Sequence, residues 1–257
     1  MTRAIDAAGL AVFRFLWGAV CFVCVVRFLA SGWIERFYGE PTFFFRYWGF
    51  GWLPVLPVPA LYAVGVVLAA CALLVAVGLF YRAAAVTFFL GFTYLQLLDV
   101  TRYLNHYWLV VWMALLFAVL PLGRAWSVDA WRHPETARSH HPAWVLWLLR
   151  FQVGVVYVFA GLAKLQPDWL VRGEPLGIWL SARHDTFLIG PVLAQAWAPL
   201  VFSWAGFLFD LTIVGWLLWR RGQSGAKKMV AATVMRNGNM PMWKRRNVVA
   251  WKAMTTR

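Results

Sequence analysis

Apolar residues form six long stretches in this 257-residue chain, separated by short segments that contain glycine, proline and charged residues. At a rise of about 1.5 Å per residue, a helix of such length crosses most or all of a hydrocarbon core of about 30 Å. The pattern therefore predicts an all-α protein, a polytopic transmembrane helix bundle with about six spans. The stretches cover residues 9–30, 60–81, 83–98, 107–122, 143–163 and 191–219.

The overall composition supports a membrane protein. Hydrophobic residues make up 62% of the chain and charged residues only 13%, which excludes an ordinary soluble domain. The first stretch exceeds the apolar core of a secretory signal, about 7 to 15 residues, and Arg14 and Arg27 interrupt it. We therefore expect it to be a retained first helix.

The net charge of +14 is concentrated at the C-terminal end. Residues 220–257 contain ten Lys or Arg and no acidic residue, which predicts a membrane domain at 1–221 and a basic tail, disordered or interfacial, at 222–257. Such a tail favours the cytoplasmic side of the membrane and contact with anionic lipids. No nucleic-acid-binding motif accompanies the charge, so nucleic acid is not an expected partner.

The fifth stretch carries most of its polar groups on one side of the predicted helix. From residue 150 they recur at i+4, i+7, i+11 and i+14, which is the spacing of one helical face. Polar and small residues in a membrane helix face protein or a cavity, because lipid cannot satisfy them. We call this set the polar stripe: Arg150, Gly154, Tyr157, Gly161 and Lys164.

Lys164 is the candidate catalytic base of the polar stripe. Loss of water disfavours an ammonium group, and an uncharged lysine can accept a proton from a weakly acidic substrate. The alternative is structural: near the end of its helix, the amine reaches the membrane interface and pairs with Asp168 one turn further on.

A second polar face is predicted at the end of the third stretch. If the helix continues, Asp99, Arg102 and His106 align on it, and Asn105 precedes His106. His106 could orient a substrate or move a proton, but one histidine without nearby ligands is not a metal site. A structural pair of Asp99 and Arg102 at the helix end is the favoured interpretation.

Other polar residues in the apolar stretches carry weaker signals. Asp210 is the only acid of the last stretch, and we expect it in an interior ion pair with Arg14, Arg27 or Arg150. Cys21 and Cys24 could form a membrane thiol-redox pair, although small buried packing residues are the favoured interpretation. No hydrolase, metalloprotease or nucleotide-binding motif occurs, and we predict no metal.

A series of short motifs follows the chain: Gly78-Leu-Phe-Tyr-Arg82, Leu98-Asp-Val-Thr101, Asn105-His106, Trp126-Ser-Val-Asp129, Leu149-Arg150, Val156-Tyr157, Ala160-Gly161, Lys164-Leu165, Asp168-Trp169 and Phe209-Asp-Leu211. In order and spacing they resemble the vitamin K-dependent γ-glutamyl carboxylases and their bacterial relatives, grouped as the horizontally transferred transmembrane (HTTM) domain. The likeness runs from about residue 13 to residue 219 and is densest at 99–210.

This resemblance implies a carbon–carbon lyase of the carboxylase type in a bacterial inner membrane. In that family the lysine of an A-G-x-x-K-L motif deprotonates vitamin K hydroquinone, and Lys164 is the matching position. The quinol anion would take up oxygen and become a strongly basic alkoxide, which removes a γ-proton from a glutamyl side chain of a peptide. The carbanion would capture CO2, and the quinone would leave as its epoxide.

The resemblance also assigns the remaining candidates. Reduced vitamin K or a related quinol, O2 and CO2 are the implied co-substrates, and membrane lipids and a glutamyl peptide the implied partners. The quinol-pocket candidates are Asn105, His106, Arg150, Tyr157, Asp168 and Trp169. The candidates for structural polar roles are Asp99, Arg102, Trp126, Asp129 and Asp210.

The chain also departs from the family pattern. Gly123-Arg124-Ala125 precedes Trp126 where family enzymes carry a histidine, and residues 222–257 do not resemble the family's C-terminal region. We therefore expect a chain that lacks the family's C-terminal region. Such a chain is either an active enzyme or an inactive member of the family. The alternatives to the enzyme are a non-catalytic scaffold that binds a quinone or lipid, and a thiol-quinone reductase using Cys21 and Cys24.

Overall fold

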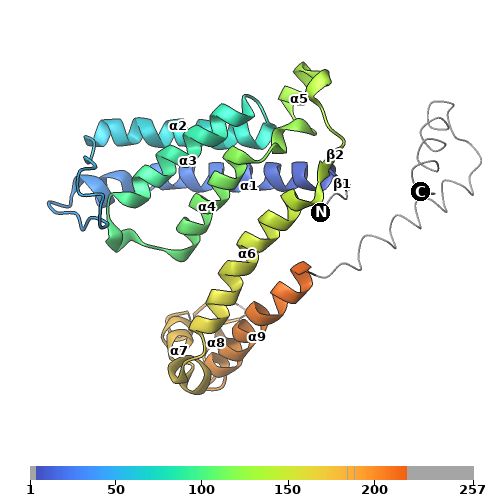
Figure 1. Cartoon of the computed structure of the whole chain (residues 1–257). Helices are drawn as coiled ribbons and strands as arrows, with labels where there is room; N and C mark the ends of the chain where they lie inside the picture. The colour runs from blue at the N-terminus through green and yellow to red at the C-terminus, as the bar shows by residue number, and fades with distance from the viewer. Residues whose placement is uncertain (1–3, 184, 188, 219–257) are drawn as a thin grey trace, which may run out of the picture. The chain divides into compact units, whose positions relative to one another are not determined.

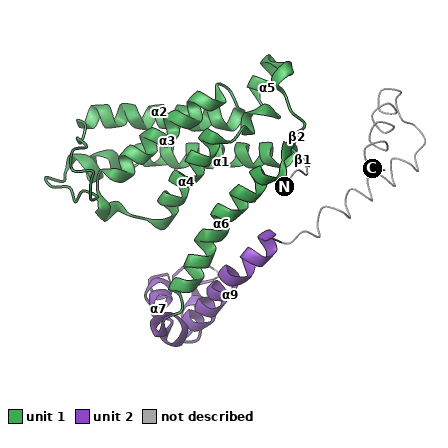
Figure 2. Ribbon diagram, viewed as in Figure 1, with its two compact units in different colours: residues 1–165 green, residues 166–257 purple. Residues whose placement is uncertain are grey.

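The computed structural model describes residues 4–183, 185–187 and 189–218, and most of these residues are helical (Figure 1). The chain divides into two compact units, residues 1–165 and residues 166–257 (Figure 2). The predicted tail at 222–257 lies outside the described residues.

Unit 1 contains the longer helices α1 (Ala8–Ala30), α2 (Val58–Val77), α3 (Tyr81–Leu97), α4 (Asn105–Val119) and α6 (Ala143–Ala163). Short elements join them: η1 (Glu35–Gly39), η2 (Val100–Arg102), η3 (Leu122–Arg124), α5 (Val128–Arg132) and η4 (Pro134–Thr136). Strands β1 (Ala4–Asp6) and β2 (His140–Pro142) pair in antiparallel fashion, with Ile5 opposite His141. This pairing holds the segment before α1 against the segment before α6.

The apolar core of unit 1 lies between α1, α2, α3 and α4. At Gly18, α1 comes so close to α2 that a Cβ atom there would lie 2.7 Å from the Ala76 nitrogen. The Trp17 ring packs against the rings of Phe88 on α3 and Phe117 on α4, with centroids 5.4 and 4.4 Å away. Tight helix contact through small residues and aromatic packing is typical of membrane bundles.

Four helices are long and apolar enough to cross a membrane: α1, α2, α6 and α9 (Ala198–Leu218). The expected count of about six is not confirmed, because α3 and α4 contain 17 and 15 residues. Left-handed Gly78 ends α2 three residues before the expected boundary, and extended Leu120 ends α4 before Pro121. The last expected stretch is also split, because residues 190–193 form the separate short helix α8.

The predicted polar face of Asp99, Arg102 and His106 is wrong. α3 ends at Leu97, and Asp99 adopts an extended conformation with φ −152° and ψ 118°. The Asp99 carboxylate accepts a hydrogen bond from the Thr101 N–H at 3.0 Å, which starts η2, and α4 begins anew at Asn105. A short acidic side chain that caps the backbone competes with helix continuation.

Unit 2 contains η5 (Asp168–Arg172), α7 (Glu174–Ser181), α8 (Gly190–Leu193) and α9. Both η5 and α7 pack against α9. The indole N–H of Trp169 donates to the Ser203 carbonyl at 3.1 Å, and that of Trp204 donates to the Leu170 carbonyl at 3.0 Å. These two hydrogen bonds join η5 to α9.

One end of unit 1 is organised around a buried arginine. Arg14 of α1 is only 1% exposed, and its guanidinium donates to the carbonyls of Leu122, Ala125 and Trp126 at 3.4, 3.4 and 2.7 Å. Gly78 lies directly against this guanidinium and against the Cβ atom of Ser127, with no space for a side chain. Its φ of 72° is also a conformation that favours glycine.

We predict that Gly78→Ala lowers the free energy of unfolding by about 1 to 3 kcal/mol, because the added methyl group is both strained and overpacked. Thermal unfolding of the detergent-solubilised protein measures the effect. Gly9→Ala is the matched control, since a Cβ at Gly9 meets nothing within 4 Å. Equal melting temperatures for the two variants would contradict the proposed packing at Gly78.

Strand β2 contains a buried histidine at the same end of unit 1. His141 is 2% exposed, and its Nε2 has no hydrogen-bond partner among the described residues. Burial, followed by the nearby charges of Arg124 and Arg138, lowers the pKa of His141 from its ordinary value of 6.5. The folded chain therefore favours the uncharged imidazole.

We predict that protonation at His141 destabilises the fold in mildly acidic solution. Folding lowers the pKa of His141 below 6.5. Between pH 6.5 and this lower pKa, the unfolded chain binds a proton at His141 and the folded chain does not. The stabilisation is therefore fully present above pH 6.5 and decreases as the pH falls through this window. Melting temperatures at several pH values should fall less for His141→Gln than for wild type, whereas exposed His140→Gln should follow wild type. An unchanged pH dependence in His141→Gln would be inconsistent with this assignment.

Candidate functional site

The polar stripe of α6 lies on the less exposed side of that helix. Gly154 and Gly161 are buried, and Arg150, Tyr157 and Lys164 are half-buried. Other positions of α6 are exposed, including Phe151 at 64% and Phe159 at 66%. The structure thus separates the polar groups of α6 from its most exposed apolar side chains.

Lys164 occupies the end of this stripe, where the regular helix stops. It is the residue immediately after α6, and its backbone N–H donates to the Gly161 carbonyl at 3.1 Å. The Leu165 N–H closes a further tight turn on Leu162 at 3.0 Å, and Pro167 follows. A half-buried amine at a helix end therefore stands next to exposed leucines: Leu162 at 51% and Leu165 at 54%.

Arg150 lies about four turns before Lys164 on the same stripe. Its guanidinium carbon is 5.5 Å from the centroid of the Trp147 ring, which is a cation–π geometry. Tyr157 lies between Arg150 and Lys164 along the helix. The stripe therefore offers a phenol and an amine, with a guanidinium further along, as groups able to bond a polar ligand.

Asn105 and His106 begin α4 and are exposed. The His106 ring packs edge-on against the Tyr107 ring, with centroids 4.6 Å apart. α4 packs against α6 within unit 1, but the described contacts do not join His106 to the polar stripe. The two sets of predicted pocket residues are thus on different helices.

Asp99 and Arg102 each have partners other than one another. Asp99 is 4% exposed and caps η2, as described above. The guanidinium carbon of Arg102 is 4.2 Å from the centroid of the Phe37 ring, which joins η2 to η1. Both residues thus have structural contacts, and these contacts fix the connections at the second end of unit 1.

The candidates in unit 2 also have local partners. The Arg172 guanidinium donates to the Asp168 carboxylate at 3.0 Å, one helical turn away, and both side chains are exposed. Trp169 is the residue that holds η5 against α9. Asp210 of α9 is 6% exposed, and it is one of the buried polar residues of this unit, with Ser203.

Asp129 joins α5 to the end of α2 and to α3, and Trp126 joins the segment before α5 to α1. Both oxygens of the Asp129 carboxylate accept backbone hydrogen bonds, from Phe80 at 2.9 Å and from Tyr81 at 2.8 Å. Phe80 and Trp126 have left-handed backbones, each with φ 46°, and the Trp126 carbonyl accepts from Arg14. Asp129 thus caps the first turn of α3 from a residue that is distant in sequence.

A cavity of about 330 Å³ opens beside this junction rather than beside the polar stripe. Arg14 is its one ionisable lining group, and the guanidinium nitrogens Nη1 and Nη2 already donate to carbonyls. The cavity therefore offers no general base. The other lining residues are Ala11, Val12, Phe15, Ala76, Val77 and Trp126.

Among residues 4–183, 185–187 and 189–218, no three His, Cys, Asp or Glu side chains lie together as a metal site. The sequence did not indicate the hydrogen bonds of Arg14 and Tyr81 or the burial of His141. The burial of Arg14 could have been inferred from the sequence, because an arginine inside an apolar stretch must find hydrogen-bond acceptors. The Tyr81 hydroxyl donates to the Phe117 carbonyl at 2.6 Å, a contact that no sequence pattern indicates.

Comparison with known proteins gives one family. The family model described as the HTTM domain matches residues 2–242, which is nearly the whole chain. The match confirms the resemblance based on the short motifs and is consistent with a vitamin K-dependent carboxylase-like protein. It continues beyond Arg221 into the basic segment. No solved structure matches the chain.

We predict that Asp129→Asn lowers the free energy of unfolding by about 1 kcal/mol, because one of the two capping acceptors and its charge are lost. Glu135→Gln is the matched control in the same segment, since Glu135 is exposed and, among the described residues, forms an ion pair only with His133. We expect its effect to be below about 0.5 kcal/mol. Thermal or denaturant unfolding in detergent compares them, and equal effects would argue against the cap.

Proposed function

Because the chain belongs to the HTTM domain family, we propose that it is a membrane enzyme of the vitamin K-dependent γ-glutamyl carboxylase type. In this proposal it couples oxidation of reduced vitamin K, or a related quinol, to carboxylation of a glutamyl side chain. The observation that carries the proposal is the position of Lys164. The lysine of the family's A-G-x-x-K-L motif lies half-buried at the end of the polar stripe of α6.

Lys164 would accept the proton of a quinol hydroxyl with its uncharged amine. The proton transfer needs an amine within hydrogen-bond reach of the hydroxyl and shielded from bulk water. When bound, the quinol supplies the reducing equivalents. One oxygen atom of O2 ends in the epoxide and the other in water, while CO2 replaces a γ-hydrogen of the glutamyl residue. Tyr157 and Arg150 would bond polar atoms of the bound substrates.

The surroundings of Lys164 suit an apolar, membrane-soluble quinol. A naphthoquinone ring and its side chain partition into the hydrocarbon region, and exposed leucines flank the amine. Leu162 and Leu165 thus offer an apolar approach from the bilayer side. The aromatic and amide groups of Trp169, Asn105 and His106, with the Asp168 carboxylate, remain candidates for further contacts with the quinol or peptide.

Four long apolar helices fit an integral membrane protein. We further propose a bacterial inner membrane as its location, with the basic tail on the cytoplasmic side, by the excess of Lys and Arg after the last span. The expected partners are membrane lipids and a glutamyl-containing peptide. Nothing in the sequence provides a nucleic-acid-binding motif.

We predict that Lys164→Ala and Lys164→Arg each lower carboxylation by at least about a hundredfold, since a general base contributes this much and a guanidinium stays protonated. The full chain in lipid nanodiscs is supplied with reduced vitamin K, O2 and labelled CO2. Label in a glutamyl peptide and epoxide are measured together. Lys227→Ala, in the basic tail, is the matched control and should retain activity.

Three other results would overturn the proposal. Wild-type activity in Lys164→Arg would remove Lys164 as the base. Quinone binding by wild type without any label incorporation would favour the non-catalytic scaffold. Quinone reduction that is lost in Cys24→Ser but retained in Lys164→Ala would favour the thiol reductase. In the proposed enzyme, Cys21→Ser is expected to leave label incorporation unchanged.

A further inference from the structure

One end of unit 1 collects the ends of three helices that are long and apolar enough to cross a membrane (Figure 1). β1 before α1 pairs with β2 before α6, and the Asp129 N–H donates to the Gly78 carbonyl after α2 at 2.9 Å. The segment 122–144 folds over this end. A segment that joins the ends of membrane spans lies at the depth of the lipid headgroups.

The segment 122–144 presents exposed tryptophans at this end. Trp131 is 81% exposed, Trp126 72% and Trp144 46%. Large aromatic side chains are usually buried in a protein core, but exposed tryptophan is enriched at the membrane–water interface. The exposure of these rings, next to the ends of the spans, is therefore the pattern of an interfacial belt.

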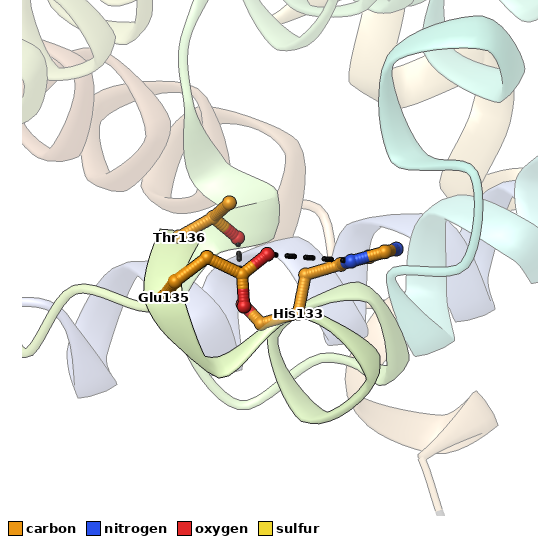
Figure 3. A network of polar contacts seen from close by, with 3 residues as sticks. All are labelled: His133, Glu135 and Thr136. Carbon is orange, nitrogen blue, oxygen red and sulfur yellow. Dashed lines mark hydrogen bonds and ion pairs between the residues drawn. The ribbon is translucent and has the colours of Figure 1, made fainter.

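The same segment presents exposed arginines: Arg124, Arg132 and Arg138. Among the described residues, none of the three forms an ion pair with a carboxylate. The nearby acids have other partners: Glu135 contacts His133 at 3.4 Å (Figure 3), and both oxygens of Asp129 cap α3. The positive charges of these arginines are thus available to bind a negatively charged partner outside the chain.

Two of these arginines lie close together. The Arg138 N–H donates to the Arg124 carbonyl at 2.8 Å, so the two residues are neighbours across the segment. Arg132 differs, because its guanidinium carbon lies 5.3 Å from the centroid of the Phe80 ring. Two exposed arginines whose backbones are joined by a hydrogen bond at headgroup depth together supply the charge that attracts a lipid phosphate.

We propose that segment 122–144 is a docking surface for anionic phospholipid, with Arg124 and Arg138 binding the headgroup phosphate and the tryptophans lying among the headgroups. In the sequence, segment 122–144 is separate from the basic tail and from Lys164, and the proposal does not depend on carboxylation. It assigns a partner to the connection between α4 and α6. It also accounts for two exposed arginines, Arg124 and Arg138, that have no carboxylate partner in the described part of the chain.

Native mass spectrometry of the full chain tests this proposal. The protein is released from nanodiscs of equal phosphatidylcholine and phosphatidylglycerol, and the retained lipids are counted. Arg124→Gln/Arg138→Gln should lower the ratio of retained phosphatidylglycerol to phosphatidylcholine, by about fivefold for each charge removed. Arg124→Lys/Arg138→Lys keeps the charge and should retain most of the preference.

Lys227→Gln/Lys228→Gln removes two charges from the basic tail and is the matched control. An unchanged lipid ratio in this control supports the proposal, whereas loss of the preference here and not in Arg124→Gln/Arg138→Gln overturns it.

Circular dichroism shows whether each variant is folded. If the glutamine variant does not fold, the test uses the wild-type protein alone. Its preference for phosphatidylglycerol should weaken as salt rises from about 50 to 500 mM. A preference that is independent of salt overturns the proposal.

Discussion

The structure of unit 1 depends on a positive charge that is buried in an apolar bundle. A guanidinium without water must find hydrogen-bond acceptors, because an unpaired buried charge costs several kcal/mol. Arg14 finds them in the carbonyls of Leu122, Ala125 and Trp126, which are free because residues 120–126 are not part of a regular helix. The buried guanidinium and the carbonyls of this segment thus satisfy one another's hydrogen-bonding requirements.

Several other features follow from this contact. Since the guanidinium occupies the space beside the α2–α3 turn, residue 78 must be glycine. The same segment continues into α5, from which Asp129 caps α3, and then into β2, which pairs with β1. The start of α6 is therefore fixed by contacts that begin at Arg14. The direction in which the polar stripe faces within unit 1 is set at this end, about 30 Å of helix away from Lys164.

The apolar pattern of the sequence was sufficient to locate some of the long helices. It did not predict where every helix ends or which distant residues contact one another. Apolar length located α1 and α6 within one residue, because both begin and end next to polar or proline-containing segments. Apolar length failed at α3, where Asp99 caps the backbone instead of extending the helix. It could not give the partners of Arg14 or Asp129, which are about 110 and 50 residues away in the chain. The placement of Lys164 at a helix end was predictable from Pro167, which cannot continue a helix.

The position of Lys164 places two physical effects in opposition. The negative end of a helix dipole favours a cation, whereas removal of water favours an uncharged amine. A lysine immediately after α6, with exposed leucines beside it, experiences the first effect in the free protein. In the proposed reaction the second effect becomes dominant only when an apolar ring covers the amine and excludes water. A bound quinol would therefore have to shield the Lys164 amine from water itself, because the leucines beside the amine are exposed.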